Sequence, residues 1–380
     1  MNSPAEATKA KPQSPEFERS GGEDTQSNQP TLVSRLLRSQ QAGLVIVLLI
    51  LGALLTFAAG THVDALSGQT VNNFLNAHTL IQMATDASAF AIMGVGATIV
   101  IIAGGIDLSV GAVYALAGVV MAMVLRAVGP MGDVATVSLA VATCLVVGLG
   151  AGLANGAMVI GLRVHPFIIT LGTMWMLRGV AFVISRAESI LVPQALTNVA
   201  KASLGLSASL YPVPLLTMLL VTVLGSVYLT RTVMGRHVFA VGGNAEASRF
   251  SGLRVDRIQL GVFVLSGLTA GFAAFIGASF YGSATSSDAT GYELYVVAAS
   301  VVGGASLSGG RGSAVSAMLG ALLIVLIRQA IRTLHLDQNY EWIIIGGALV
   351  VAVVIDQSGA RLLQRRLARH GGSSRPRAAA

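Results

Sequence analysis

The carboxylate best placed to do chemistry in the apolar part of this sequence is that of Asp107, in the stretch GGIDLSVG at residues 104–111. A carboxylate between two long apolar runs can relay a proton, contact a polar solute or cap a helix. Gly104 and Gly105 allow a tight chain reversal. Asp107, assisted by Ser109, can then accept hydrogen bonds from the free N–H groups of a helix that begins there. We favour this capped turn over a direct contact between Asp107 and a solute.

A second glycine-rich stretch, GGASLSGG at residues 303–310, agrees with GGIDLSVG at five of eight positions. Each stretch has a Gly-Gly pair, then Leu-Ser, then a final glycine, which is Gly111 in the first stretch and Gly310 in the second. The two stretches are either paired glycine turns of similar build or a chance similarity between turns rich in small residues. The candidate residues of the second turn are Gly303, Gly304, Ser308, Gly309 and Gly310.

Residue patterns typical of catalysis or metal binding are missing from the sequence. The single cysteine, Cys144, can form no internal disulfide, and we interpret it as a small buried hydrophobic residue. We find no group of His, Asp or Ser at the spacing of a metal site or a nucleophile, so we expect no catalytic residue, no metal and no cofactor. No glycine-rich loop ends in Gly-Lys-Ser/Thr, so we expect no ATPase site in this chain.

The elements that must position these residues are apolar. Hydrophobic residues make up 54% of the 380-residue chain and charged residues 11%, and the mean hydropathy is +0.74. Runs of about 20 apolar residues, the length of a membrane-spanning helix, recur along it. The sequence therefore predicts an all-α polytopic membrane protein with about ten transmembrane helices. The expected spans are 42–60, 84–103, 109–128, 135–160, 166–185, 212–231, 258–281, 292–310, 313–332 and 340–356. The eighth is glycine-rich at its end and either spans the membrane or is re-entrant.

The two ends of the chain differ from its apolar middle. Residues 1–40 are polar and predict a disordered cytoplasmic tail, residues 41–357 form the transmembrane domain, and residues 358–380 predict a basic cytoplasmic tail. Most of the 24 Lys and Arg residues fall on the side of the N-terminus when ten spans are counted, which indicates cytoplasmic termini. The net charge of +7 suits anionic membrane lipid, so we expect contact with lipid and no binding of nucleic acid.

Four ordered motifs resemble the permease subunits of bacterial ribose-type monosaccharide ABC importers. They are AIMGVGATIVIIAGGIDLSVGAVYALAG from residue 91, NGAMVIGLRVHPFIITLGTMWMLRG from residue 155, AVGGNAEASRFSGL from residue 240 and GYELYVVAASVVGGASLSGGRGS from residue 291. The resemblance covers about residues 40–357. It implies a translocation subunit in the bacterial inner membrane that moves a monosaccharide or related polyol. It also implies three partners: a cytoplasmic ATPase with tandem nucleotide-binding domains, a periplasmic sugar-binding protein, and a second permease copy, identical or paralogous.

The longest interior cytoplasmic loop, about residues 232–257, has helical signals of its own. Asn244 can cap a helix of about two turns over residues 245–251, and Gly252 suits the left-handed residue that ends it. The spacing Glu-Ala-Ser-xxx-Gly from residue 246 resembles the Glu-Ala-Ala-xxx-Gly signature of ABC importer permeases. That resemblance implies a coupling helix in a groove of the ATPase, and the alternative is a solvated loop that only enforces orientation. The candidate coupling residues are Asn244, Glu246, Ala247 and Gly252.

Polar residues inside the predicted spans are few. Asn155, Thr170 and Thr173 offer amide and hydroxyl groups that suit a sugar path, although such groups more often hold helices together. Arg178 lies in the outer part of a predicted span, where we expect its side chain to extend toward the membrane surface. By this topology the acidic residues fall in loops or near span ends, unlike the carboxylates of proton-driven transporters. An ion-coupled secondary transporter of a small polar solute is the alternative function.

Overall fold

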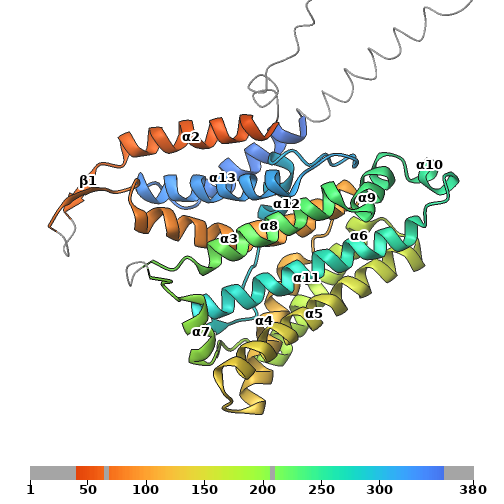
Figure 1. Cartoon of the computed structure of the whole chain (residues 1–380), viewed down its shortest axis with the longest axis horizontal. Coiled ribbons are helices and arrows are strands. Elements are labelled where there is room, and N and C mark those ends of the chain that lie inside the picture. Colours follow the sequence, from red (N-terminus) through yellow and green to blue (C-terminus); the bar gives the residue numbers. More distant parts are fainter. Residues whose placement is uncertain (1–39, 64–67, 206–209, 355–380) are drawn as a thin grey trace, which may run out of the picture. The chain divides into compact units, whose positions relative to one another are not determined.

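The computed structural model describes residues 40–63, 68–205 and 210–354 (Figure 1). The tails predicted for residues 1–40 and 358–380 lie outside these ranges, except that residue 40 begins a helix. The described helices are α2 (Gln40–Ala58), α3 (Ala77–Ile102), α4 (Val110–Val128), α5 (Asp133–Leu162), α6 (Pro166–Ser185), α7 (Gln194–Ala200), α8 (Val213–Arg231), α9 (Val233–Gly243), α10 (Ala245–Phe250), α11 (Val255–Tyr281), α12 (Tyr292–Val302), α13 (Ala314–Thr333) and the helix Tyr340–Val354. Strands β1 (Thr61–Val63) and β2 (Thr70–Asn72) pair antiparallel, as do β3 (Ile190–Leu191) and β4 (Ser283–Ala284).

Eight of the described helices are long and apolar enough to cross a membrane, namely α2, α3, α4, α5, α6, α8, α11 and α13. Two shorter apolar helices, α12 and Tyr340–Val354, occupy the eighth and tenth predicted positions. The predicted all-α polytopic fold is therefore confirmed. The 11 residues of α12 extend about 16 Å, roughly half of the hydrocarbon core. The segment 292–310 is thus a short helix followed by a glycine-rich turn rather than one continuous spanning helix.

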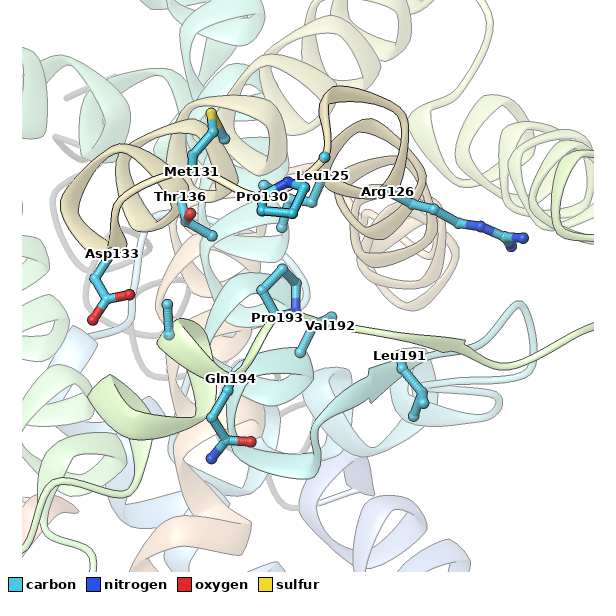
Figure 2. Close-up of a pocket in the computed structure, with 12 residues that line it drawn as sticks. Leu125, Arg126, Pro130, Met131, Asp133, Thr136, Leu191, Val192, Pro193 and Gln194 are labelled. Atoms are coloured by element: carbon cyan, nitrogen blue, oxygen red, sulfur yellow. The ribbon is translucent and has the colours of Figure 1, made fainter.

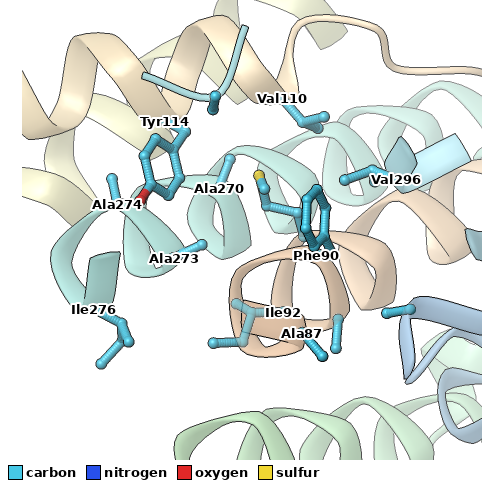
Figure 3. Close-up of a cluster of buried hydrophobic side chains, with 14 of the residues drawn as sticks. Ala87, Phe90, Ile92, Val110, Tyr114, Ala270, Ala273, Ala274, Ile276 and Val296 are labelled. Carbon is cyan, nitrogen blue, oxygen red and sulfur yellow. The ribbon is translucent and has the colours of Figure 1, made fainter. Parts of the chain in front are cut away.

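The core forms around α3, which packs against α8, α11, α12 and α13. Figure 3 shows Ala87, Phe90 and Ile92 of α3 together with Tyr114 of α4 and small side chains of α11, such as Ala270. Small residues matter in such a core because lipid offers no hydrophobic driving force between helices, so close packing must supply the stability. A buried α3 thereby fixes the position of the irregular segment that follows it.

Glycines also bring α5 and α11 together. Gly148, Gly152 and Gly156 of α5 recur at every fourth residue, so they form a stripe along one face of the helix. A Cβ at any of these three positions would collide with Gly267, Phe263 or Leu260 of α11. This is the small-xxx-small packing of membrane helices, and it fixes α11 beside the connection between α3 and α4.

Candidate functional site

Asp107 lies in the connection between α3 and α4, where residues 105–109 have no regular secondary structure, and it is 2% exposed. Its Oδ1 accepts hydrogen bonds from the backbone N–H of Ser109 (2.9 Å) and from the hydroxyl of the same residue (2.6 Å). Its Oδ2 accepts from the hydroxyl of Ser266 in α11 (2.7 Å). The carboxylate therefore joins the start of α4 to α11.

The structure corrects the predicted capping role of Asp107. The N-cap residue of α4 is Ser109, whose side chain makes no capping hydrogen bond, and Asp107 accepts from Ser109 rather than from the first turn of α4. Ser266 lies eleven residues beyond Val255, the first residue of α11, which is about 16 Å along the helix. The chain does not reverse at once after α3, so residues 105–109 carry Asp107 in among the packed helices.

Two of the three predicted path residues join this network. Asn155 of α5 donates from Nδ2 to the hydroxyl of Ser109 (2.8 Å), and Thr170 of α6 donates to the carbonyl of Ile106 (3.1 Å). Thr173 donates to the carbonyl of Thr170 on its own helix (3.2 Å). The Oδ1 of Asn155 is buried and accepts no hydrogen bond. Polar groups from α5, α6 and α11 thus surround the segment that leads into α4. We call Asp107, Ser109, Asn155, Thr170 and Ser266 the Asp107 network.

The structure brings the two glycine-rich stretches into contact. The backbone N–H of Gly310 donates to the carbonyl of Ile102 at the end of α3 (2.8 Å). Gly104 has a φ of +86° and Gly309 a φ of +81°, conformations that a residue with a side chain adopts only with strain. A Cβ at Gly309 would also lie 3.2 Å from the Cα of Gly104. The two turns therefore pack backbone against backbone.

Helix α9 supplies the third part of this contact. A Cβ at Gly242, near the end of α9, would collide with the carbonyl oxygen of Ile102 and would lie 2.7 Å from the nitrogen of Gly310. The next residue, Gly243, has no heavy atom within 4 Å of the place where a Cβ would be. We call Gly104, Gly242, Gly309 and Gly310 the glycine contact. A comparison of the two glycine-rich stretches could not predict this contact, because Gly242 belongs to neither of them.

The other residues of the two stretches lie around these contacts. A Cβ at Gly105, Gly111 or Gly303 would crowd a neighbouring side chain or carbonyl oxygen. Gly304 has a φ of +103°, and Ser308 is exposed. Apart from Ser308, these residues therefore serve close backbone packing or backbone conformation.

The local prediction for α10 is confirmed. Asn244 is the N-cap, and its Oδ1 accepts from the backbone N–H of Ala247 (2.8 Å). Gly252 has a φ of +83°, in the left-handed region, and Glu246 is exposed in the first turn. The sequence analysis missed Phe250, whose 85% exposure leaves a large apolar ring in solvent at the end of this short helix. A phenylalanine between the polar residues Arg249 and Ser251 is the signal that identifies it.

The prediction that Arg178 extends toward the membrane surface is wrong. Its side chain is buried and donates to the backbone carbonyls of Ser286 (3.0 Å), Asp288 (2.5 Å) and Ala289 (3.2 Å). The segment before α12 is not helical over most of its length, so its carbonyl oxygens need donors from elsewhere. Arg178 supplies these donors. An arginine within an apolar helix is unusual, and this could have indicated from the sequence that its side chain has buried partners.

A cleft of about 490 Å³ lies at the other end of α4, away from the Asp107 network (Figure 2). It is bounded by the connection between α4 and α5 and by the segment that leads into α7. Its polar lining includes Arg126, Asp133, Thr136 and Gln194. The two ends of α4 therefore lie in different polar environments.

The described residues hold no group of three or more His, Cys, Asp or Glu side chains that could bind a metal ion. Cys144 is buried, and its thiol donates to the carbonyl of Ala117 (3.6 Å). The side chains of Asp107, Asn155, Arg178 and Cys144 each form a hydrogen bond with a segment of the chain other than their own.

Comparisons with known proteins identify the family. A family model described as "Branched-chain amino acid transport system / permease component" matches residues 79–353. The ribose import permease protein of Escherichia coli (strain K12) is 35% identical over 285 residues, 75% of this chain and 87% of the relative. The D-allose transport system permease protein of the same strain is 34% identical over 287 residues, with 75% and 85% covered. The L-arabinose ABC transporter permease protein of Azospirillum brasilense is 31% identical over 319 residues, with 83% and 87% covered. No solved structure matches the chain. The chain therefore belongs to this family of transport-system permease components.

Proposed function

We propose that this chain, the translocation subunit of a monosaccharide importer of the ATP-binding-cassette type, works with three partners in the bacterial inner membrane. A separate cytoplasmic ATPase with tandem nucleotide-binding domains hydrolyses ATP, a periplasmic binding protein delivers a sugar or related polyol, and a second permease copy completes the path. The relatives named for ribose, D-allose and L-arabinose support this assignment, as does the polytopic fold.

The observation that carries the proposal is a continuous set of contacts from α10 to the Asp107 network. Helix α10 exposes Phe250 and follows α9 directly. Near the end of α9, Gly242 packs on the end of α3 and on the second glycine turn. From there the chain leads through residues 105–109 to Asp107 and Ser266. A displacement of α10 by the ATPase is therefore passed to the helices that surround the start of α4.

The alternative, an ion-coupled secondary transporter, needs a carboxylate that is free to bind and release a proton or cation. Asp107 accepts three hydrogen bonds from groups of this chain. This arrangement, together with the similarity to an ABC transporter permease, favours the ATP-driven mechanism.

Replacement of the exposed residues of α10 tests the coupling. Phe250→Ala removes an apolar side chain that suits a groove on the ATPase, and Glu246→Lys reverses a charge in the first turn. We expect Phe250→Ala to lower ATP hydrolysis stimulated by the loaded binding protein at least tenfold, since a buried aromatic anchor is typically worth about 2 kcal/mol or more. We expect Glu246→Lys to lower it as well, because a positive charge in the first turn disfavours α10. The measurement is stimulated ATP hydrolysis in vesicles that contain the complete importer.

The matched control is Phe57→Ala, because Phe57 is 89% exposed on the apolar helix α2, far along the chain from α10. It should leave stimulation unchanged. Gly252 is left intact, because its positive φ would make any side chain a folding defect. Normal stimulation in both α10 variants, with the ATPase still bound, would leave this loop with a role in orientation only.

A further inference from the structure

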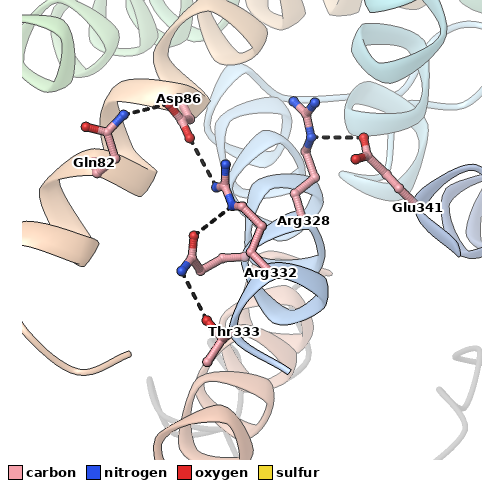
Figure 4. A network of polar contacts seen from close by, with 7 residues as sticks. Gln82, Asp86, Arg328, Arg332, Thr333 and Glu341 are labelled. Atoms are coloured by element: carbon pink, nitrogen blue, oxygen red, sulfur yellow. Dashed lines mark hydrogen bonds and ion pairs between the residues drawn. The ribbon is translucent and has the colours of Figure 1, made fainter. Parts of the chain in front are cut away.

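Charged side chains from three helices meet near the end of α3 that lies opposite the glycine contact (Figure 4). Asp86 of α3 pairs with Arg332 of α13 at 3.2 Å, and Arg328 of α13 pairs with Glu341 of the helix Tyr340–Val354 at 2.9 Å. The two carboxylates are largely shielded, with side-chain exposures of 17% for Asp86 and 14% for Glu341. Charged groups among apolar membrane helices are costly, so a set of four points to a functional use.

Aromatic rings surround these ion pairs. The Phe90 ring centroid lies 4.4 Å from that of Tyr292 and 5.7 Å from that of Tyr295. The Tyr292 ring lies 6.3 Å from that of Tyr114 in α4. The guanidinium carbon of Arg328 lies 5.6 Å from the Phe90 ring centroid and 5.4 Å from that of Tyr295. We call Asp86, Phe90, Tyr292, Tyr295, Arg328, Arg332 and Glu341 the aromatic–ionic cluster.

A narrow cleft between α3, α4, α11 and α12 reaches this cluster. Its polar lining includes Asp86, Ser88, Tyr114 and Tyr292. The free volume is about 20 Å³, which is enough for one water molecule. The cleft is therefore too small to hold a sugar in this conformation, so the helices around it must separate before a sugar can enter.

We propose that the aromatic–ionic cluster contacts the neutral sugar in transit and so contributes to the choice of substrate; this rests on the proposed function. Two carboxylates and two guanidinium groups cancel in formal charge, so the site favours an uncharged solute over an ion. Carboxylate oxygens accept hydrogen bonds and guanidinium N–H groups donate them, so these groups can bind sugar hydroxyls once the helices separate. The aromatic rings provide apolar faces for the C–H groups of the sugar ring, the usual composition of a small-molecule pocket.

The test uses vesicles that contain the permease with its ATPase and its binding protein. The probes are radiolabelled D-ribose, D-allose and L-arabinose, and both sugar uptake and ATP hydrolysis are measured. Tyr292→Leu removes a ring from the cluster, Tyr292→Phe keeps the ring and removes the hydroxyl, and Asp86→Asn breaks the pair with Arg332. The controls are Tyr340→Leu and Asp337→Asn, which change exposed residues outside the cluster.

We expect Tyr292→Leu and Asp86→Asn to lower the sugar moved per ATP hydrolysed at least fivefold and to change the ratio of rates among the three sugars. Stimulated hydrolysis should stay within twofold of the parent, Tyr292→Phe should have an intermediate effect, and both controls should match the parent. Unchanged uptake in the cluster variants overturns the proposal. So does an equal fall of uptake and hydrolysis for every sugar, because that is the sign of a purely structural role. If the parent permease takes up none of the three sugars, or takes them up without ATP, the result contradicts the proposed function rather than this inference.

Discussion

Asp107 and Arg178 carry opposite charges but have the same structural role. Each holds irregular backbone between helices: Asp107 accepts from three donors of Ser109 and Ser266, and Arg178 donates to three carbonyl oxygens before α12. A buried polar group without a partner costs about 1–3 kcal/mol, so these bonds decide whether such backbone is tolerated inside the bundle.

Substitution of Asp107 separates hydrogen bonding from charge. In Asp107→Asn the amide oxygen still accepts from Ser109, and the Ser266 hydroxyl can turn to accept from the amide nitrogen, so we expect thermal stability and transport close to the parent. Asp107→Leu leaves the donors of Ser109 and Ser266 buried without an acceptor and should destabilise the permease by about 2–4 kcal/mol. Thermal unfolding of the detergent-solubilised protein measures both changes.

The single change Ser266→Ala serves as the control for that series, because it removes one of the three donors and should fall between the other two variants. If Asn proves as damaging to transport as Leu while expression and unfolding temperature stay normal, the charge of Asp107 itself is used in the transport cycle.

At the scale of elements, the glycine contact lets α3, α9 and the turn after α12 meet without intervening side chains. The α5–α11 interface uses glycine in the same manner, but between regular helices. Backbone packed directly on backbone has little room to yield, so we expect any motion of α9 to be transmitted to α3 rather than absorbed.

Two neighbouring glycines test this contact. Gly242→Ala places a methyl group against the carbonyl oxygen of Ile102 and should lower stimulated ATP hydrolysis at least tenfold, or prevent stable insertion. Gly243→Ala places its methyl group in open space and should be neutral. Equal behaviour of the two variants, measured by unfolding temperature and by stimulated hydrolysis, would show that α9 does not need this close approach.

The sequence predicted most of these elements, but not how they meet. Apolar length located all ten apolar helices, and capping chemistry located α10. Local patterns cannot indicate that Ser266 reaches Asp107 across 159 positions, because this depends on the rotation of α11 about its axis. The role of Arg178 was missed for the same reason, since its acceptors lie more than 100 residues away.

At the scale of the whole molecule, the basic residues predict that α10 faces the cytoplasm and that the segment before α12 faces the periplasm. The eight long helices and two short ones do not by themselves decide which side is which. Exposed serines on the two sides offer a direct measurement.

Cysteine placed at Ser287 should react with an impermeant thiol reagent in intact cells, and cysteine at Ser251 should react only after lysis. Both positions are exposed, whereas the adjacent Ser286 is 2% exposed and unsuitable. The background is Cys144→Ala, which removes the only native thiol. Reversed labelling would overturn the predicted orientation of the entire chain.

The short length of α12 has a consequence for biosynthesis. Eleven residues are too few to enter a bilayer as an independent span. Arg328 and Arg332 lie in the C-terminal part of α13, where charged side chains make insertion of the helix less favourable. Asp86, which pairs with Arg332, belongs to α3, and α3 leaves the ribosome long before α13. We therefore expect α12 and α13 to enter the membrane against helices already there, and a ribosome that stalls before α13 to leave α12 without the helix that it packs against.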